Sequence, residues 1–343
     1  MRVTMVSRVP LEPSSTRQDG FGTRLIEELP PAGSVERLVL APTLATPGSE
    51  QAIRARAAHL TSLGPGPVGR VFRVERKAGA LSVLSLVPDG VTLSDILAAL
   101  EFGTLTLSND EVLELAASIV RAAAGMHELL GTLAHGALAP AHVVLKRDGS
   151  AMFTGAVFGD AIQALQRNRE HIWREFGLAL PAAASVPRFD QHGDVTQLGA
   201  LVLAIGQRRS LRRDEFPRSV GDLVMTTSIA PTAHTSARLR MWLQDALQLH
   251  GRVVFSSGVD ALRAFNRFLP NGCGEGAGAL ALRTAILQVC GESEPRPVAD
   301  AVGEAAEHRP RTAAPSNVWS SQTWNHVAGG APAGGQRHVA TRS

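Results

Sequence analysis

The sequence predicts an α+β fold with two lobes: a small N-terminal β-sheet lobe with one helix, and a larger, mostly α-helical C-terminal lobe. Two observations support this prediction. Short apolar runs separated by Gly and Pro fill residues 23–84, whereas the apolar residues follow a helical period from Val91 onward. Because 44% of the 343 residues are hydrophobic, the chain can bury a substantial core, built mainly from aliphatic side chains and Ala.

The small lobe is predicted to contain several strands and one helix. The strands lie in the segments TRLIEEL, RLVLA, VGRVFRVE and LSVLSLV, at residues 23–29, 37–41, 68–75 and 81–87. Gly or Pro residues bound these short apolar runs, as is typical of strands. Between the second and third strands, residues 49–63 have a helical pattern, with Ser49 as the predicted N-cap.

Capping residues mark two helices at the start of the large lobe. Thr92 and Asp95 form a predicted capping box before the segment ILAALEF, and Ser108 and Glu111 form another. The second box opens a long helix with one apolar face, which Gly131 is predicted to end.

Further helices are predicted toward the end of the large lobe. Residues 194–205 are apolar nearly all round, as expected of a helix buried inside a helical lobe. The segments ARLRMWLQDALQL and SSGVDALRAFNRFL predict two more helices, with Ser256 or Ser257 as the N-cap of the second.

The chain is predicted to have three parts. Residues 1–20 form a loose leader, and residues 21–269 form the folded domain, with lobes at about 21–87 and 88–269. Residues 270–343 form a low-complexity, largely disordered tail, in which ALALRTAILQV and ADAVGEAAEH are candidate short helices. The tail segment WSSQTWNHV is either a short docking motif or, as we favour, part of a disordered end.

Composition excludes several classes of protein. The net charge is only +3 and no dense Lys/Arg stripe occurs, so nucleic-acid binding is not expected. No apolar run approaches the ~18 residues of a membrane span, and the N-terminal segment lacks the apolar core of a signal peptide. Cys273 and Cys290 have no Cys or His partners at metal-ligand spacing. We therefore expect a cytoplasmic protein with neither a disulfide framework nor a zinc site.

Two segments carry a resemblance to a known family. HGALAPAHVVL at residues 135–145, with a DG turn at 148–149, is similar to the catalytic loop His-Arg-Asp-Leu-Lys-Pro-x-Asn of protein kinases. GDVTQLGALVLAI at residues 193–205 resembles the Asp-Val-x-x-Leu-Gly start of their buried helix. The chain from about residue 23 to 269 thus resembles the protein kinase-like superfamily, in particular bacterial Ser/Thr kinases, which implies the two-lobed fold.

Some residues match the family's scaffold positions. These structural remnants are His135, Leu138, Pro140, Asp194 and Gly199. In the family, the residue at Asp194 hydrogen-bonds the backbone of the catalytic loop; the alternative is a simple N-cap of the following helix. Both roles would make Asp194 a residue of stability rather than of catalysis.

The residues that carry the family's chemistry are missing from this sequence. The catalytic Asp falls on Ala137, the loop Lys on Ala139, the metal-binding Asn on His142, the Asp of the second metal-binding motif on Gly155, and the small-lobe Lys on Ala41. Phosphoryl transfer depends on positioning and on neutralising charge with metal ions and cations, so these losses predict an inactive site.

Three other features agree with this loss. The only lysines are Lys77 and Lys146, and neither lies where the small-lobe Lys is needed; the Glu that pairs with that Lys in the family falls near Arg56. His142 lacks ligand partners at useful spacing, so we favour a packed or surface role over metal binding. The segment SVPRFDQHGD has Arg188 where the family has Glu, which also argues against ordinary peptide-substrate docking.

A nucleotide cleft is the remaining candidate site. The resemblance places the Gly-rich phosphate loop at LPPAGSVE, where Gly33 is the only glycine and the two prolines offer no N–H. Other cleft positions are Leu84 as the gate, Leu86 and Val87 on the linking strand, and Leu145. We expect no bound metal and no magnesium site, and ATP binding is compatible with the sequence but not supported by it.

The predicted function is that of a catalytically inactive kinase-like domain, a pseudokinase. Its retained frame around an emptied site favours a regulatory scaffold that binds a protein partner, such as a signalling protein or an active kinase. The alternatives are a divergent enzyme that uses Arg and His in place of Lys and metal, and a nucleotide-binding switch without turnover. Magnesium-dependent phosphate transfer would distinguish the enzyme, and binding of ATP alone the switch.

Overall fold

The computed structural model describes residues 16–29, 33–181, 187–227, 232–269 and 277–290. An antiparallel sheet forms the N-terminal lobe, with strand order β1-β2-β3-β5-β4. Its strands are β1 (Arg17–Asp19), β2 (Gly22–Leu29), β3 (Gly33–Leu40), β4 (Val71–Lys77) and β5 (Ala80–Leu86). The predicted strands thus form, and β1 is an addition to them.

Strand β1 corrects the predicted leader. Arg17, Gln18 and Asp19 pair with the beginning of β2, so the folded domain starts before residue 21. A three-residue polar strand has no alternating apolar pattern, and therefore gave no strand signal in the sequence. The first fifteen leader residues lie outside the described part of the chain.

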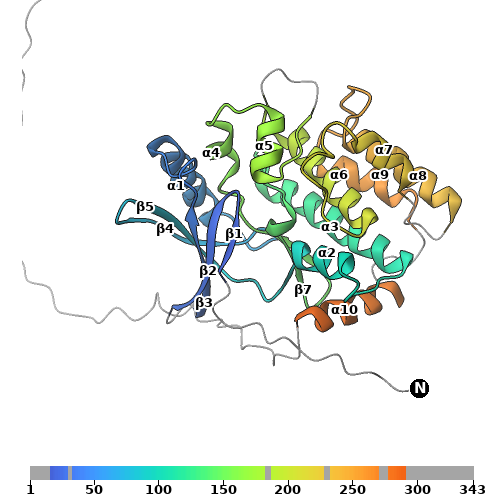
Figure 1. Ribbon diagram of the computed structural model, residues 1–343, viewed down its shortest axis with the longest axis horizontal. Helices are drawn as coiled ribbons and strands as arrows, with labels where there is room; N and C mark the ends of the chain where they lie inside the picture. Colours follow the sequence, from blue (N-terminus) through green and yellow to red (C-terminus); the bar gives the residue numbers. More distant parts are fainter. Residues whose placement is uncertain (1–15, 30–32, 182–186, 228–231, 270–276, 291–343) are drawn as a thin grey trace, which may run out of the picture. The chain divides into compact units, whose positions relative to one another are not determined.

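Helix α1 (Pro47–Thr61) follows β3 and lies against α4 and β4. Its N-cap is Thr46 rather than the predicted Ser49, because the Thr46 hydroxyl accepts a hydrogen bond from the Ser49 N–H and Pro47 occupies the first turn. Figure 1 shows α1 beside the strands of the small lobe.

The C-terminal lobe is mostly helical, as predicted. It contains α2 (Leu93–Glu101), α3 (Asn109–Leu130), α4 (Gly159–Gln163), α5 (Arg169–Phe176), α6 (Gln191–Gln207), α7 (Val220–Thr226), α8 (Ala233–Ala246) and α9 (Gly258–Asn266). A small sheet lies within it, in the order β6 (Gly90–Thr92), β7 (Val143–Lys146), β8 (Ala151–Phe153).

The capping residues of the large lobe largely follow the prediction. Ser108 and Glu111 form both hydrogen bonds of a capping box at α3, and Gly131 ends that helix. Thr92 caps α2, and Ser257 caps α9. The N-capping residues predict where the helices begin, because their side chains accept hydrogen bonds from backbone N–H groups that the helix itself leaves unpaired.

Helix α10 (Ala277–Cys290) corrects the predicted boundary of the tail. It was expected only as a candidate short helix, but it packs against α3, α2 and β6 (Figure 1). Its side chains Leu282, Ala285 and Ile286 are buried in the core of the helical lobe. The folded part therefore extends past residue 269, and the tail segment WSSQTWNHV lies outside the described residues.

Two hydrophobic cores hold the described residues. The larger lies among the helices of the C-terminal lobe around α3 and α6. The smaller contains residues of both lobes, among them Phe21 and Leu38 of the sheet with Ala137, Val157 and Phe158 of the helical lobe. The smaller core therefore joins the two lobes by apolar packing around Phe21.

Candidate functional site

The predicted catalytic loop forms the floor between the lobes, and two side chains of α6 fix its backbone. Asp194 accepts hydrogen bonds from the N–H groups of His135 (2.6 Å) and Gly136 (2.7 Å). Gln197 accepts one from the Leu138 N–H (2.6 Å). The N-cap of α6 is Asp190, so the alternative role of Asp194 as the N-cap is wrong.

Asp194 also binds His127 of α3. The His127 ring takes a hydrogen bond on Nδ1 from the Gly258 N–H (2.7 Å), so its Nε2–H donates to Asp194 at 3.0 Å. One buried carboxylate therefore joins the loop, α3 and the start of α9. Gly199 lets α6 pack closely against α8, because a Cβ on it would lie only 3.1 Å from the Cβ of Ala246.

The loop positions that a kinase uses for chemistry are buried. The exposed fractions are 0% for Ala137, 5% for Ala139 and 0% for His142. Ala137 and Ala139 belong to the core that joins the lobes. A carboxylate or ammonium group here would be taken out of water with no opposite charge supplied at the alanines, at a cost of several kcal/mol per ion.

His142 is a neutral hydrogen-bonding residue. Its Nδ1–H donates to the Ala137 carbonyl at 2.8 Å, and its Nε2 accepts from Nη2 of Arg24 at 2.8 Å. Complete burial, reinforced by the charge of Arg24, lowers the pKa of His142 to about 4. The described residues contain no group of His, Cys, Asp and Glu that could hold a metal ion.

Gly155 cannot accept the side chain that a magnesium site needs. Its φ is +79°, and a Cβ on it would lie 3.0 Å from ring atoms of His142. An Asp at this position would therefore strain the backbone and press against the imidazole. His142 and Gly155 thus occupy both predicted metal-ligand positions, and the His142 ring fits there because Gly155 has no side chain.

Arg24 of β2 fills the cleft from the small lobe. Only 7% exposed, it donates to Asp19 Oδ2 (2.8 Å) and to Glu36 Oε1 (2.7 Å) as well as to His142. The carboxylates of Asp19 and Glu36 raise the pKa of the guanidinium against the opposing effect of burial. A permanently charged side chain therefore reaches the loop floor where metal and phosphate would lie.

The phosphate loop was predicted at the wrong turn. Gly33 begins β3 at the turn after β2, where an added Cβ would meet no other atom within 4 Å, and Pro30 and Pro31 lie outside the described residues. The first hairpin turn is instead Asp19–Gly22, with sequence DGFG. The signal that was missed is this pair of glycines around a phenylalanine, inside the segment assigned to the leader.

Two of the N–H groups of the DGFG turn are taken by the turn's own carboxylate. Asp19 Oδ1 accepts hydrogen bonds from the N–H groups of Phe21 (2.9 Å) and Gly22 (3.2 Å). Phe21 is buried against the rings of His142, Phe158 and Phe176, at centroid distances of 4.4, 5.4 and 5.2 Å. The turn thus packs against the loop floor through Phe21, and the Asp19 carboxylate accepts the hydrogen bonds that a bound anion would otherwise accept.

The small-lobe lysine position is also corrected. Ala41 follows β3 rather than lying on it. The positions of β3 that share a face with the Arg24 contact are Ser34, Glu36, Leu38 and Leu40. None of them is a lysine, so the sequence argument from the absent Lys survives although the residue assigned to it was wrong.

Arg56 makes a second connection between the lobes. It lies on α1, is 6% exposed, and donates to the carbonyls of Ala156 (Nε, 3.2 Å) and Ala134 (Nη2). An Arg at the position predicted for the paired Glu therefore holds α1 to the loop backbone. Arg24 and Arg56 together fasten the sheet and its helix to the same floor.

His135 is a core residue of this floor. It is fully buried, its Nδ1 accepts from the Ala137 N–H at 3.2 Å, and its ring lies 5.9 Å from that of Phe153. Burial lowers its pKa to about 3, so it is neutral and not placed to exchange protons with solvent. Leu138 and Pro140 complete the retained backbone of the loop.

A cavity of about 720 Å³ remains beside the linking strand. Leu86 and Val87 line it as predicted, together with Ile26 and Val144. Leu84 and Leu145 are fully buried and do not line it. Leu145 belongs to the core of the helical lobe, on the opposite face of β7 from Val144.

The linking strand has no spare N–H where a purine base would need one. The Leu86 N–H donates to the Arg70 carbonyl (3.2 Å) and the Val87 N–H to the Ser34 carbonyl (3.3 Å). Pro88 has no N–H at all. A ring nitrogen placed in this cavity would thus stay without a donor from these three residues, which is costly for a buried polar atom.

A comparison with solved structures identifies the fold. The crystal structure of the Mycobacterium tuberculosis PknI kinase domain is similar with a TM-score of 0.52 and 18% identity, over 78% of this chain and 100% of that domain. Single and double variants of the same domain each give 0.51 and 18%, over 78% of this chain and 99% of theirs. The chain therefore has the protein kinase-like fold.

Sequence comparisons add no family assignment. No protein-family model matches the chain, and no curated protein sequence matches it at a significant level. In the part of the chain that the structure describes, no helix is both long and apolar enough to cross a bilayer.

Proposed function

We propose that this chain is a pseudokinase: a kinase-fold protein that transfers no phosphate and acts as a protein-binding scaffold. The observation that supports this best is the buried contact between Arg24 and His142, at 2.8 Å. It fills the phosphate and metal region from both lobes with side chains that satisfy one another. A partner such as a signalling protein or an active kinase, in the cytoplasm, fits this proposal.

The loss of catalysis follows from charge as well as from sequence. Catalysis of phosphoryl transfer needs metal ions that neutralise the developing charge. Their ligands are replaced by a neutral His142 and by Gly155, and the space is closed by Phe21. Opening it would expose part of an apolar core and break the Arg24 contacts.

The test measures nucleotide binding and phosphate transfer with the purified full chain. We expect ATP at about 5 mM, with or without magnesium, to raise the melting temperature by less than about 1 °C, because a ligand at or below its Kd adds at most about 0.4 kcal/mol. We expect no transfer of labelled phosphate to casein. An active kinase domain assayed in parallel is the positive control.

A matched variant separates true activity from contamination. Val87 lines the cavity and is 39% exposed, so Val87→Trp would fill the cavity without burying a charge. Transfer that is present in the unaltered chain and lost in Val87→Trp would overturn the proposal. Transfer that persists in both comes from a contaminating kinase and leaves the chain without activity.

A nucleotide-binding switch is the second candidate, favoured by the size of the cavity beside Leu86 and Val87. It predicts a melting-temperature rise of several degrees with ATP that Val87→Trp removes, and no phosphate transfer. That pattern of results would favour the nucleotide-binding switch over a scaffold that binds no nucleotide.

A further inference from the structure

Two further cavities meet beside α3, and the first of them shares Leu86, Val87 and Pro88 with the cavity that Arg24 lines. One of about 410 Å³ lies between the α1–β4 connection, the linking strand and α3. The other, of about 540 Å³, lies between α3, the β7–β8 turn and α10. Gly66, Lys146 and Met152 line both, so the cavities form one continuous groove.

The first half of this groove is apolar. Leu60, Leu63, Val68, Leu129 and Met152 line it, all half-buried. Val87 adds a side chain that is 39% exposed. Half-buried aliphatic walls of this kind gain free energy when a further apolar side chain removes them from water.

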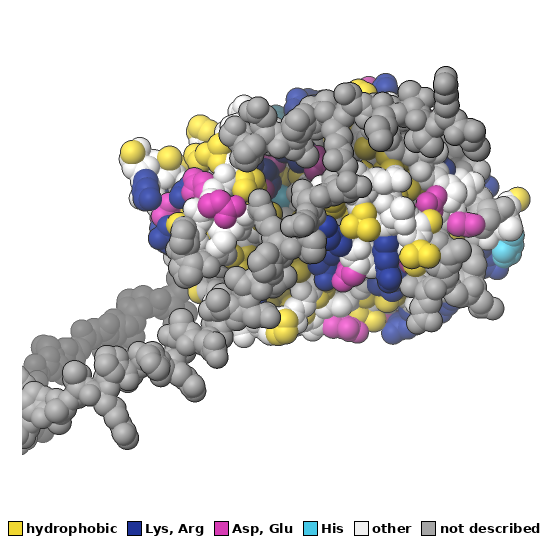
Figure 2. Space-filling view, turned by 90° about the horizontal axis from the view of Figure 1, so that it is seen from below, with side chains coloured by type: hydrophobic (Ala, Val, Ile, Leu, Met, Phe, Trp, Pro, Cys, Tyr) yellow, Lys and Arg dark blue, Asp and Glu magenta, His cyan; other side chains and the backbone are white. Residues whose placement is uncertain are grey.

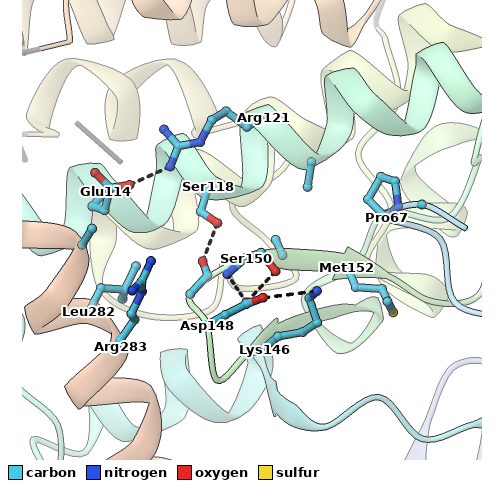
Figure 3. A pocket seen from close by; sticks show the side chains of 15 residues that line it. Pro67, Glu114, Ser118, Arg121, Lys146, Asp148, Ser150, Met152, Leu282 and Arg283 are labelled. Atoms are coloured by element: carbon cyan, nitrogen blue, oxygen red, sulfur yellow. Dashed lines mark hydrogen bonds and ion pairs between the residues drawn. The ribbon is translucent and has the colours of Figure 1, made fainter. Parts of the chain in front are cut away.

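The second half of the groove is charged (Figure 3). Arg121 comes from α3, Lys146 from β7 and Arg283 from α10, and these cations surround the same space. The carboxylates in it are Glu114, which is paired with Arg121 at 2.6 Å, and Asp148. Figure 2 shows that basic, acidic and hydrophobic side chains occur together on the face seen from below.

The spare hydrogen-bonding capacity in this half lies with the donors. Asp148 accepts from both the N–H (2.8 Å) and the hydroxyl (2.6 Å) of Ser150, while Lys146 reaches it only at 3.5 Å. Arg283 is exposed and makes no ion pair with any described residue. An ammonium group has three donors and a guanidinium five, so this end of the groove can accept an additional carboxylate.

We propose that this groove binds an extended segment of a partner protein, with apolar residues at the α1–β4 end and an acidic residue against Lys146 and Arg283. The proposal rests on the scaffold function above and names its docking surface. Apolar anchors give most of the affinity in such contacts, and charge complementarity gives register and specificity.

The experiment selects phage-displayed random peptides of about 12 residues on the immobilised full chain, and measures the affinity of the selected peptides by fluorescence anisotropy. We expect peptides in which apolar residues stand next to Asp or Glu. The double variant Lys146→Glu, Arg283→Glu should weaken them about tenfold, and Arg283→Gln about two- to fivefold, as exposed ion pairs allow.

Two further variants control the position. Gly66 lies where the cavities join, and its Cβ would meet only the flexible end of Leu129, at 2.6 Å. Gly66→Phe should therefore fill the junction and lower affinity about tenfold or more, as for a lost central contact. Arg218→Glu, on a side chain that is 75% exposed and does not line the groove, should leave binding unchanged.

Melting curves of each variant show whether it is folded, and Arg283→Gln changes only an exposed side chain. Recovery of no peptides, peptides without acidic residues, or equal binding to the double variant would overturn the proposal. An equal loss of peptide affinity in Arg218→Glu would also overturn it, since the peptides would then be attracted by the overall positive charge rather than by this groove. The phosphate-transfer assay on the unaltered chain measures no peptide binding, and the residues replaced in the groove, Gly66, Lys146 and Arg283, do not line the cavity beside Val87 and Ile26, so the scaffold proposal can fail or stand separately.

Discussion

Replacing Arg24 by Met should destabilise the fold more than any comparable Arg replacement on the sheet. The guanidinium is 7% exposed and donates to Asp19, Glu36 and His142, at 2.8, 2.7 and 2.8 Å. Met keeps most of the volume but leaves the buried Nε2 of His142 without a donor. It also removes the positive charge from two carboxylates that are 24% and 29% exposed.

The expected loss can be assembled from these contacts. An unsatisfied buried acceptor costs about 1–3 kcal/mol, and breaking a buried ion pair costs about 3–5 kcal/mol when a charge stays behind. Because the carboxylates of Asp19 and Glu36 still reach water, we expect about 3 kcal/mol in total, near the lower end of these ranges. Urea unfolding followed by circular dichroism gives the free energy directly.

Arg37→Met is the matched control. Arg37 also lies on the sheet, but the carboxylates it pairs with, Glu27 and Glu75, both belong to the same sheet, and its side chain is 16% exposed. We expect a loss of about 1 kcal/mol there, as for a more solvated pair. Equal losses in Arg24→Met and Arg37→Met would refute the view that Arg24 fastens the lobes.

Three further predictions concern the loop floor. Burial lowers the pKa of His142 to about 4 and that of His135 to about 3, from 6.5, so the unfolded chain binds more protons than the folded chain below pH 6.5. The free energy of unfolding should therefore fall by about 4 kcal/mol from pH 7 to pH 5. A free energy that stays constant over that window in urea titrations would contradict this. Asp194→Asn keeps one acceptor and turns an NH₂ group toward the N–H of His135 or Gly136. Thermal and urea unfolding should therefore show a free energy of unfolding that is lower by about 2–4 kcal/mol. An unchanged free energy would show that these hydrogen bonds are dispensable. Ala137→Asp introduces an acid at a position that is 0% exposed, where the neighbouring cation, Arg24, is already paired with Asp19 and Glu36. It should lower stability by about 3 kcal/mol or more and give no phosphate transfer; a melting temperature equal to that of the unaltered chain would show that the floor opens.

The fold was largely predictable because its signals are local. The capping box of Ser108 and Glu111 and the apolar face that follows it give α3 from a few residues. The buried helix α6 shows in its continuous apolar run. What the sequence did not show are β1 and the extent of α10, since pairing of three polar residues and packing of a Gly- and Ala-rich segment depend on distant partners.

The candidate site divides in the same way. The residues of the loop itself, from His135 to His142, could be assigned by their spacing, because the loop is continuous in sequence. The contact of Arg24 with His142 joins residues 118 positions apart, and only the folded chain brings them together. The prediction at Gly33 passed over the first hairpin turn, Asp19–Gly22, because that turn is flanked by a strand without an apolar pattern.

The closed cleft gives the alanines of the loop a physical meaning beyond lost chemistry. A kinase must keep carboxylates and cations hydrated until substrate arrives, so its floor cannot enter an apolar core without the cost of burying charge. Because Ala137 and Ala139 carry no charge, the floor can pack against Phe21 and join the small core. The charge that remains, on Arg24, is met by Asp19, Glu36 and a neutral His142. In the proposed pseudokinase, the uncharged loop and the closed floor therefore depend on each other: a carboxylate introduced by Ala137→Asp would have to compete with the packing around Phe21.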